Sequence, residues 1–345
     1  MTKQIKVGNV LVGGGAPVPI QSMTNTRTDD VASTVEQIRR LEAAGCQIVR
    51  VAVPDMAAAR AVGAIREQIS IPLVVDIHFD YKLALECVAA GCDKVRINPG
   101  NIGGEEKVKA VARACREKGV PIRIGVNGGS LEKELLAKYG GVTAQAMVDS
   151  AFGHIRLLNQ FDFDDICVSL KSSDVQTTVA AYRLMSQQSD YPLHLGVTEA
   201  GTPKMGLLKS AAGIGGLLAS GIGDTFRITL TADPVEEIYA ARDLLKAIGL
   251  RKDGPTLVAC PTCGRTRIDL ISLANQVEER LKTVDKPITV AVMGCAVNGP
   301  GEASAADVGI AGGDGEGLLF CKGKILHKVP QERLLDALFE LIDTL

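Results

Sequence analysis

The sequence predicts a (β/α)8 barrel followed by a small α+β domain. The first observation is an alternation of short β-branched runs with longer helical stretches, repeated eight times before residue 250. The second is a recurring plan of a helix end, a glycine and an arginine-bearing strand, seen in AAGCQIVRV (43–51), AAGCDKVRI (89–97) and ASGIGDTFRI (219–228). An open doubly wound sheet is the alternative, but it commonly stops at about five to seven strands.

The elements of the first domain follow in order. IKVGNVLVGG alternates apolar and polar residues around Gly8-Asn9, which predicts a hairpin that acts as a lid or cap. The eight expected strands are 18–22, 47–53, 72–78, 94–98, 121–126, 165–170, 192–197 and 225–230. Helices are expected to begin near residues 30, 56, 81, 104, 143, 175, 205 and 234, the last at the strong start signal Asp233-Pro234.

A domain boundary is expected in IGLRKDGPT (248–256), where charge, glycine and proline concentrate. We therefore assign residues 1–250 to the barrel and residues 256–345 to the second domain. The second domain is expected to contain strands, a Gly-rich loop and two helices: strands 257–260, 288–294, 307–311, 317–321 and 324–329, a helix over 266–282, and a final helix.

The composition excludes several classes of partner. The 38 Lys and Arg nearly balance the 40 Asp and Glu, so no global field attracts nucleic acid or an anionic membrane. The longest uncharged runs are short and rich in Gly, Ala or Pro, which argues against a membrane span. The nine cysteines are odd in number and no secretory signal opens the chain, so a reduced, cytoplasmic protein is expected.

Basic residues are expected to gather on the barrel axis. Apolar residues flank four strand arginines and must face the helices, which turns the arginines inward: Arg50, Arg96, Arg123 and Arg227. The same phase turns several other polar residues inward: Asp76, His78, Asn98, Asn127, Ser169 and Lys171. Isolated structural ion pairs are the simpler reading, but Asp76 is the only evident carboxylate partner on the strands. The surplus charge favours a small ligand with several negative charges, such as a diphosphate.

Loop residues should join this site at the carboxyl ends of the strands. Candidates are Asn25, Lys204 and Glu199, with Glu199 a possible proton donor in the GVTEAGT loop.

The cysteines divide into two classes. Five fall singly in barrel elements, where they are expected to pack as small apolar residues: Cys46, Cys87, Cys92, Cys115 and Cys167. In the second domain, Cys260 and Cys263 form a Cys-x-x-Cys pair after one strand, and Cys295 follows another. These cysteines fit three kinds of site: a redox dithiol, a zinc site that also uses Cys321 or His327, and an iron–sulfur cluster. Three thiolates best suit a [4Fe-4S] cluster in which one iron is reactive.

Eight motifs resemble one family across nearly the whole chain. They are QSMTNT (21–26), VDIHF (75–79), RINPGNIG (96–103), IRIGVNGGSL (122–131), VSLKSSD (168–174), LGVTEAGT (195–202), CPTCGR (260–265) and MGCAVNGPGEA (293–303). Together they resemble the 4-hydroxy-3-methylbut-2-enyl diphosphate synthases of the methylerythritol phosphate isoprenoid pathway, in their two-domain bacterial form.

The resemblance implies reductive opening of 2-C-methyl-D-erythritol 2,4-cyclodiphosphate. It implies a [4Fe-4S] cluster bound by Cys260, Cys263, Cys295 and Glu302, and a flavodoxin or ferredoxin as electron donor. Glu199, His78 and Asn127 would surround the reacting carbons. The implied substrate-binding residues are Asn25, Arg50, Asp76, Arg96, Asn98, Arg123, Ser169, Lys171, Lys204, Arg227 and Thr229. The family also implies a homodimer in which the cluster domain of one subunit covers the barrel of the other.

Two other function classes fit part of the pattern. One is a non-redox diphosphate-binding barrel enzyme that resembles pteroate synthases and carries a structural zinc domain. The other is a binding protein whose thiolate domain senses iron or redox state.

Overall fold

The computed structural model describes residues 1–98, 100–296 and 303–345. The chain divides into two compact units, Met1–Ile248 and Gly249–Leu345. Each unit has its own apolar core.

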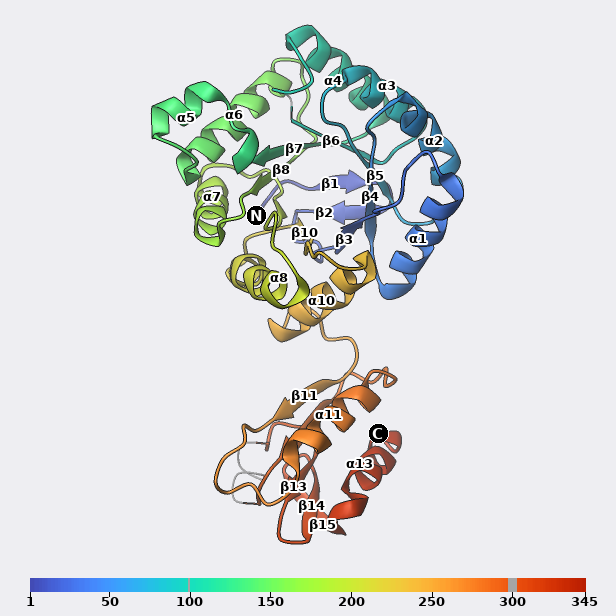
Figure 1. The fold of residues 1–345 in the computed structure, drawn as a ribbon, viewed down its shortest axis with the longest axis vertical. Coiled ribbons are helices and arrows are strands. Elements are labelled where there is room, and N and C mark those ends of the chain that lie inside the picture. The colour runs from blue at the N-terminus through green and yellow to red at the C-terminus, as the bar shows by residue number, and fades with distance from the viewer. Residues whose placement is uncertain (99, 297–302) are drawn as a thin grey trace. The chain divides into compact units, whose positions relative to one another are not determined.

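The first unit is a barrel of eight parallel strands surrounded by helices (Figure 1). Its strands are β3 Gln21–Met23, β4 Ile48–Ala52, β5 Leu73–Asp76, β6 Lys94–Ile97, β7 Ile122–Asn127, β8 Ile166–Lys171, β9 His194–Leu195 and β10 Thr225–Phe226. β3 to β8 form one sheet in chain order, and β9 pairs with β10. Parallel bridges between Val168 and Leu193 and between Ile20 and Phe226 join these two sheets into a closed ring. The predicted barrel is confirmed.

The helices of this unit follow the strands as expected. They are α1 Val31–Ala44, α2 Met56–Arg66, α3 Tyr81–Ala89, α4 Glu105–Lys118, α6 Ala144–Asn159, α7 Val175–Gln188, α8 Pro203–Ser210 continuing through the π-helical turn η2 Ala211–Gly215 into α9 Gly216–Ala219, and α10 Pro234–Ala247. Side chains of Asp30, Asp55 and Asp80 accept hydrogen bonds from first-turn N–H groups of α1, α2 and α3. Among the described residues, no helix combines the length and apolar character needed to span a bilayer.

The amino-terminal hairpin closes one end of the barrel. β1 Ile5–Val7 and β2 Val10–Val12 pair antiparallel around Gly8, whose φ of 57° suits the tight turn. Their buried side chains pack against Ile48, Val74 and Cys167, which lie near the beginnings of their strands. The hairpin, drawn across the centre of the ring in Figure 1, therefore caps the amino ends of the strands, opposite the expected site.

One segment of the barrel was not predicted. Residues between β7 and α6 form a 3₁₀ turn, η1 Gly128–Ser130, and a short helix, α5 Lys133–Tyr139. No side chain of α5 is buried, so the segment carries no apolar periodicity that sequence reasoning could detect.

The second unit is a five-stranded mixed sheet. Its strands, in spatial order, are β11 Thr256–Ala259, β12 Thr289–Met293, β13 Val308–Gly312, β14 Glu316–Cys321 and β15 Lys324–Pro330. β12 pairs parallel with both β11 and β13. β14 pairs antiparallel with both β13 and β15. Helices α11 Leu270–Leu281 and α13 Leu334–Asp343, the latter preceded by the 3₁₀ turn η3 Gln331–Arg333, pack with the sheet in one core. A separate cluster is built largely of alanines with Met293 and Phe320.

Candidate functional site

A cavity of about 260 Å³ lies where the barrel strands end. Its lining is strongly polar and consists of Arg50, Asp76, His78, Arg96, Arg123, Asn127, Ser169, Lys171, Thr198, Arg227 and Thr229. All but Thr198 were predicted from the sequence. The barrel therefore brings together ten predicted residues that are up to 179 positions apart, from Arg50 to Thr229.

Two glycines make room for the basic side chains. A Cβ at Gly125 of β7 would lie 2.4 Å from Nε of Arg96. A Cβ at Gly196, just after β9, would lie 2.6 Å from Nζ of Lys171. Any larger residue at either position would displace a cation from the axis, so the glycines belong to the site's construction.

Asp76 organises one side of the cavity. Its Oδ1 accepts a 3.0 Å hydrogen bond from Nη1 of Arg96, and its Oδ2 lies 3.8 Å from Nε of Arg50 and 3.4 Å from Nε2 of His78. Burial alone would raise the pKa of Asp76, but Arg50, His78 and Arg96 outweigh burial and hold the pKa well below its usual value. Asp76 is therefore an anion that fixes Arg50 and Arg96.

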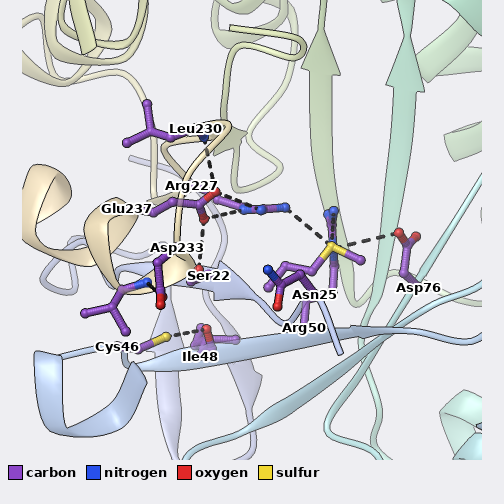
Figure 2. A network of polar contacts seen from close by, with 12 residues as sticks. Ser22, Asn25, Cys46, Ile48, Arg50, Asp76, Arg227, Leu230, Asp233 and Glu237 are labelled. Carbon is purple, nitrogen blue, oxygen red and sulfur yellow. Dashed lines mark hydrogen bonds and ion pairs between the residues drawn. The ribbon is translucent and has the colours of Figure 1, made fainter. Parts of the chain in front are cut away.

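Arg227 is held from outside the ring by a helix residue. Its Nε and Nη2 donate to Oε2 and Oε1 of Glu237 at 2.9 and 3.0 Å, as Figure 2 shows. Glu237, in the first turns of α10, also accepts from the Ser22 hydroxyl at 2.9 Å and from the Leu230 N–H at 3.2 Å. It is only 2% exposed. The reading of Asp76 as the only carboxylate partner is therefore corrected, because Glu237 supplies a second.

The thioether of Met23 lies between two of the guanidinium groups. Nε and Nη2 of Arg50 lie 3.0 and 2.9 Å from its sulfur, and Nη1 of Arg227 lies 3.4 Å from it. Sulfur is a weak acceptor without charge, so it spaces the two cations without neutralising either.

The remaining cations have no carboxylate of their own. Arg123 is 1% exposed, and its Nε and Nη1 find no hydrogen-bond partner among the described residues. Burial, with Arg96 nearby, lowers its pKa to about 10. Burial also lowers the pKa of Lys171, with Arg123 and Arg50 adding to the effect. The cavity therefore holds positive charge that its own carboxylates do not balance.

Four predicted residues do not line this cavity. Asn25 is exposed and bonded to Gln37, whose Nε2 donates to its Oδ1 at 2.6 Å. Asn98 is buried, and its Oδ1 accepts from the Gly100 N–H at 3.1 Å. Lys204 is exposed in the first turn of α8. Glu199 is exposed next to Thr198, with a φ of 52° that few non-glycine residues adopt.

The cysteines of the second unit come from two adjacent loops. Cys260 follows β11 and Cys295 follows β12, its parallel neighbour. The Gly294 N–H donates to Sγ of Cys260 at 3.1 Å, which joins the two loops. Cys295 is 8% exposed and Cys263 is exposed. Hydrogen bonds from the backbone and side chain of Arg265 lower the pKa of the Cys263 thiol, which favours the thiolate that metals bind.

The thiols of the second unit are candidate ligands for a metal group. Within residues 1–98, 100–296 and 303–345, no three His, Cys, Asp or Glu side chains converge to hold one metal ion. Glu302, the fourth implied ligand, lies outside the described residues. The five barrel cysteines are all buried, as expected for packing residues.

Both units match one protein family. Residues 2–242 match the GcpE TIM-barrel domain, and residues 256–344 match the GcpE protein C-terminal domain. The chain belongs to the GcpE family.

Full-length relatives of this GcpE chain share one name, 4-hydroxy-3-methylbut-2-en-1-yl diphosphate synthase (flavodoxin). The relative from Shouchella clausii is 60% identical over 100% of this chain and 94% of its own length. That from Clostridium perfringens is 60% identical over 100% and 99% of the two chains. That from Geobacter sulfurreducens is 60% identical over 99% and 97%. The family resemblance inferred from the motifs is confirmed.

The solved structures that resemble this GcpE chain show the fold of its barrel only. A dihydropteroate synthase from Stenotrophomonas maltophilia superposes with a TM-score of 0.52 at 13% identity, covering 71% of this chain and 97% of that one. A type I 3-dehydroquinate dehydratase from Clostridium difficile gives 0.51 at 14% identity, covering 72% and 98%. Such identities show the fold only. The pteroate synthase-like alternative with structural zinc is therefore not favoured over the function named in the 60% identical relatives.

Proposed function

We propose that this chain catalyses the reaction for which its relatives are named, with 2-C-methyl-D-erythritol 2,4-cyclodiphosphate as substrate and (E)-4-hydroxy-3-methylbut-2-enyl diphosphate as product. The observation that carries the proposal is the excess of basic side chains around the cavity, with Arg123 and Lys171 lacking a carboxylate partner among its lining residues. A cyclic diphosphate supplies the missing negative charge, and guanidinium groups match its oxygens.

The barrel residues divide into two roles. Arg50, Arg96, Arg123, Lys171 and Arg227 bind the diphosphate. Ser169, Thr229, Asp76, Asn25, Asn98 and Lys204 complete the proposed substrate-binding set. The cations stay in place as the reaction proceeds, so they stabilise the charge that develops on the phosphate when the ring opens.

The reaction consumes two electrons and one proton. The ring C–O bond to phosphate breaks, a double bond forms, and the neighbouring hydroxyl leaves as water. His78 and Asn127, which line the cavity, would orient the reacting carbons. Glu199, beside Thr198 at the cavity wall, is the proposed donor of the proton that leaves in water.

The electrons require a redox group, and the second unit offers its ligands. Cys260, Cys263 and Cys295 would bind three irons of a [4Fe-4S] cluster, and Glu302 the fourth. When bound, the cluster would supply electrons one at a time and an iron with an exchangeable ligand. A carboxylate suits that last position because it is harder and more exchangeable than a thiolate. The adjacency of the two cysteine loops and the lowered pKa of Cys263 support this assignment.

The proposed partners follow from the chemistry and from the relatives. Their name specifies flavodoxin, and a small flavodoxin or ferredoxin would deliver the two electrons singly. We also propose a homodimer, in which one subunit's cluster domain serves the partner's barrel, and a cytoplasmic location.

Anaerobic turnover with reduced flavodoxin tests the proposal. We expect the purified holoenzyme to convert the cyclic diphosphate to the linear butenyl diphosphate, detected by mass spectrometry. Glu302→Ala should lose turnover while the barrel stays folded, whereas Glu316→Ala, an exposed acid on β14, should keep it. Full activity in Glu302→Ala would refute the ligand assignment, and no product from wild type would refute the function.

Cys295→Ser and Cys321→Ser form a second matched pair. Cys321 lies on β14, in register with Val308 of β13, and is not one of the proposed ligands. Cys295→Ser should lose iron, and Cys321→Ser should retain it. The reverse result would place Cys321 among the ligands.

A further inference from the structure

Lys94 lies directly beneath the cavity and has no role in the proposed reaction. It is the first residue of β6, two positions before Arg96, so both side chains face the barrel axis. Lys94 is 0% exposed and does not line the cavity, whereas Arg96 does. It therefore belongs to a deeper layer of the barrel interior.

The floor below this layer is apolar. Lys94 stands in register with Val74 of β5, which packs with Ile48, Cys167 and the buried residues of the amino-terminal hairpin. The hairpin thus closes the barrel on the side away from the cavity. With 0% exposure Lys94 is shielded from solvent, and Arg96 lies two positions further along the strand, toward the cavity.

In the part of the chain that the structure describes, no carboxylate acts on Lys94. Its Nζ finds no hydrogen-bond partner among the described residues. The titratable groups around it are Cys167 of β8, Arg123 of β7, Arg50 of β4 and His194 of β9. Burial raises the pKa of Cys167 and lowers that of His194, so both are neutral near pH 7. The two arginines are positive and repel a charged amine.

An ammonium ion in such a place is costly, so the amine sheds its proton more easily than an exposed lysine does. Burial, with Arg123 and Arg50, lowers the pKa of Lys94 to about 8. A diphosphate in the cavity would reverse the local potential, because it brings negative charge to the guanidinium groups that disfavour the ammonium form.

We propose that Lys94 takes up a proton when the diphosphate binds in the cavity above it, so that substrate binding is linked to protonation of the barrel floor. The inference rests on the proposed function, which supplies the diphosphate. Lys94 is thus a positioning residue: once charged, it attracts the bound anion from below without touching the reacting carbons.

The sign of the pH dependence follows from this linkage. Binding raises the pKa of Lys94 above its value in the free protein. Below pH 8 the amine is already charged, so binding is insensitive to its titration. Above pH 8 binding must first add the proton, so affinity falls by up to about tenfold per pH unit.

Calorimetry on the anaerobic holoenzyme measures this proton directly. Heats of binding of the cyclic diphosphate, taken in two buffers of different ionisation enthalpy, give the number of protons taken up. Lys171 also faces the diphosphate with a lowered pKa, so the quantity that tests Lys94 is the difference between wild type and Lys94→Met. At pH 8.5 wild type should take up more protons than Lys94→Met, and this difference should fall toward zero at pH 6.5.

Two further variants keep the test decisive. Cys167→Ala alters the same buried layer without removing the amine and should take up protons as wild type does. Lys94→Gln, neutral at every pH, replaces Lys94→Met if the latter does not fold. Equal proton uptake in wild type and the Lys94 variants at pH 8.5 overturns the inference alone. Failure of wild type to bind the cyclic diphosphate overturns the proposed function, and this inference with it.

Discussion

Two arginines of the cavity differ in how their charge is balanced. Arg123 has no carboxylate and leaves two nitrogens unpaired among the described residues. Arg227 forms two hydrogen bonds with Glu237, an acid that is itself almost fully buried. The first arginine is therefore free to serve a ligand, while the second also holds the protein together. The two substitutions should have different consequences.

Replacing Arg123 should weaken ligand binding without weakening the fold. A charged hydrogen bond contributes about 1.5–3 kcal/mol, so Arg123→Met should raise the Kd for the cyclic diphosphate about 10- to 150-fold. Because the substitution removes an unpaired buried cation, the thermal midpoint should not fall. Calorimetric titration and thermal unfolding check the two halves. Unchanged affinity would show that Arg123 does not face the ligand.

Replacing Arg227 alone should destabilise the protein. Arg227→Ala leaves Glu237 as an uncompensated buried charge, which costs about 3–5 kcal/mol in the free energy of unfolding. The double variant Arg227→Met/Glu237→Met should recover most of this loss. Arg113→Ala, which breaks an exposed pair with Glu117 on α4, should leave the denaturation midpoint near that of wild type. Equal losses in the single and double variants would refute the coupling.

The site residues on the strands could be predicted from the sequence, whereas Glu237, their partner on helix α10, could not. Val49 and Val51 on either side of Arg50 predict its direction, because apolar neighbours must face the helices. Glu237 carries no such signal, since reaching Arg227 depends on where α10 begins and how it meets β3 and β10. Lys94 was overlooked although it is in phase with Arg96.

At the scale of elements, the amino-terminal hairpin closes one end of the barrel. The hairpin's inward residues complete an apolar floor, and its outward residues do not contribute to that floor. Its existence could be predicted from the Gly8-Asn9 turn and the alternating pattern around it. Its place at the amino ends of the strands could not, because no local pattern says which end of a barrel a hairpin covers.

The hairpin should stabilise the barrel through its inward face only. Val7 is 0% exposed, so Val7→Ala should lower the free energy of unfolding by about 1–3 kcal/mol. Leu11→Ala lies on the same hairpin at 46% exposure and should have little effect. Urea denaturation followed by circular dichroism compares them. Equal effects of the two variants would mean that the hairpin does not form a floor.

At the scale of the whole molecule, the chain consists of two units with separate cores. The alternation of elements predicted the barrel, and the motifs predicted the family. The proposed fourth cluster ligand, Glu302, came only from the family resemblance, because the Gly-rich sequence around it has no pattern that singles out a carboxylate over Cys321.

The first unit should fold and bind anions without the second. Residues 1–248 contain the closed ring, its hairpin floor and every residue that lines the cavity. We expect this fragment to unfold in one cooperative transition and to bind inorganic pyrophosphate, measured by calorimetry. The same fragment carrying Arg123→Met should bind it more weakly. A fragment that is unfolded, or that binds no pyrophosphate, would show that the site needs the second unit.

We propose that the barrel holds a diphosphate and works with an iron–sulfur cluster held by the second unit. The absorption spectrum and iron content of anaerobically purified protein, with and without the cyclic diphosphate, test it most directly. We expect a brown protein with broad absorption at about 400 nm, about four irons per chain, and a spectrum that changes when the substrate is added. A colourless protein that contains zinc, or a cluster spectrum that the substrate leaves unchanged, would contradict it.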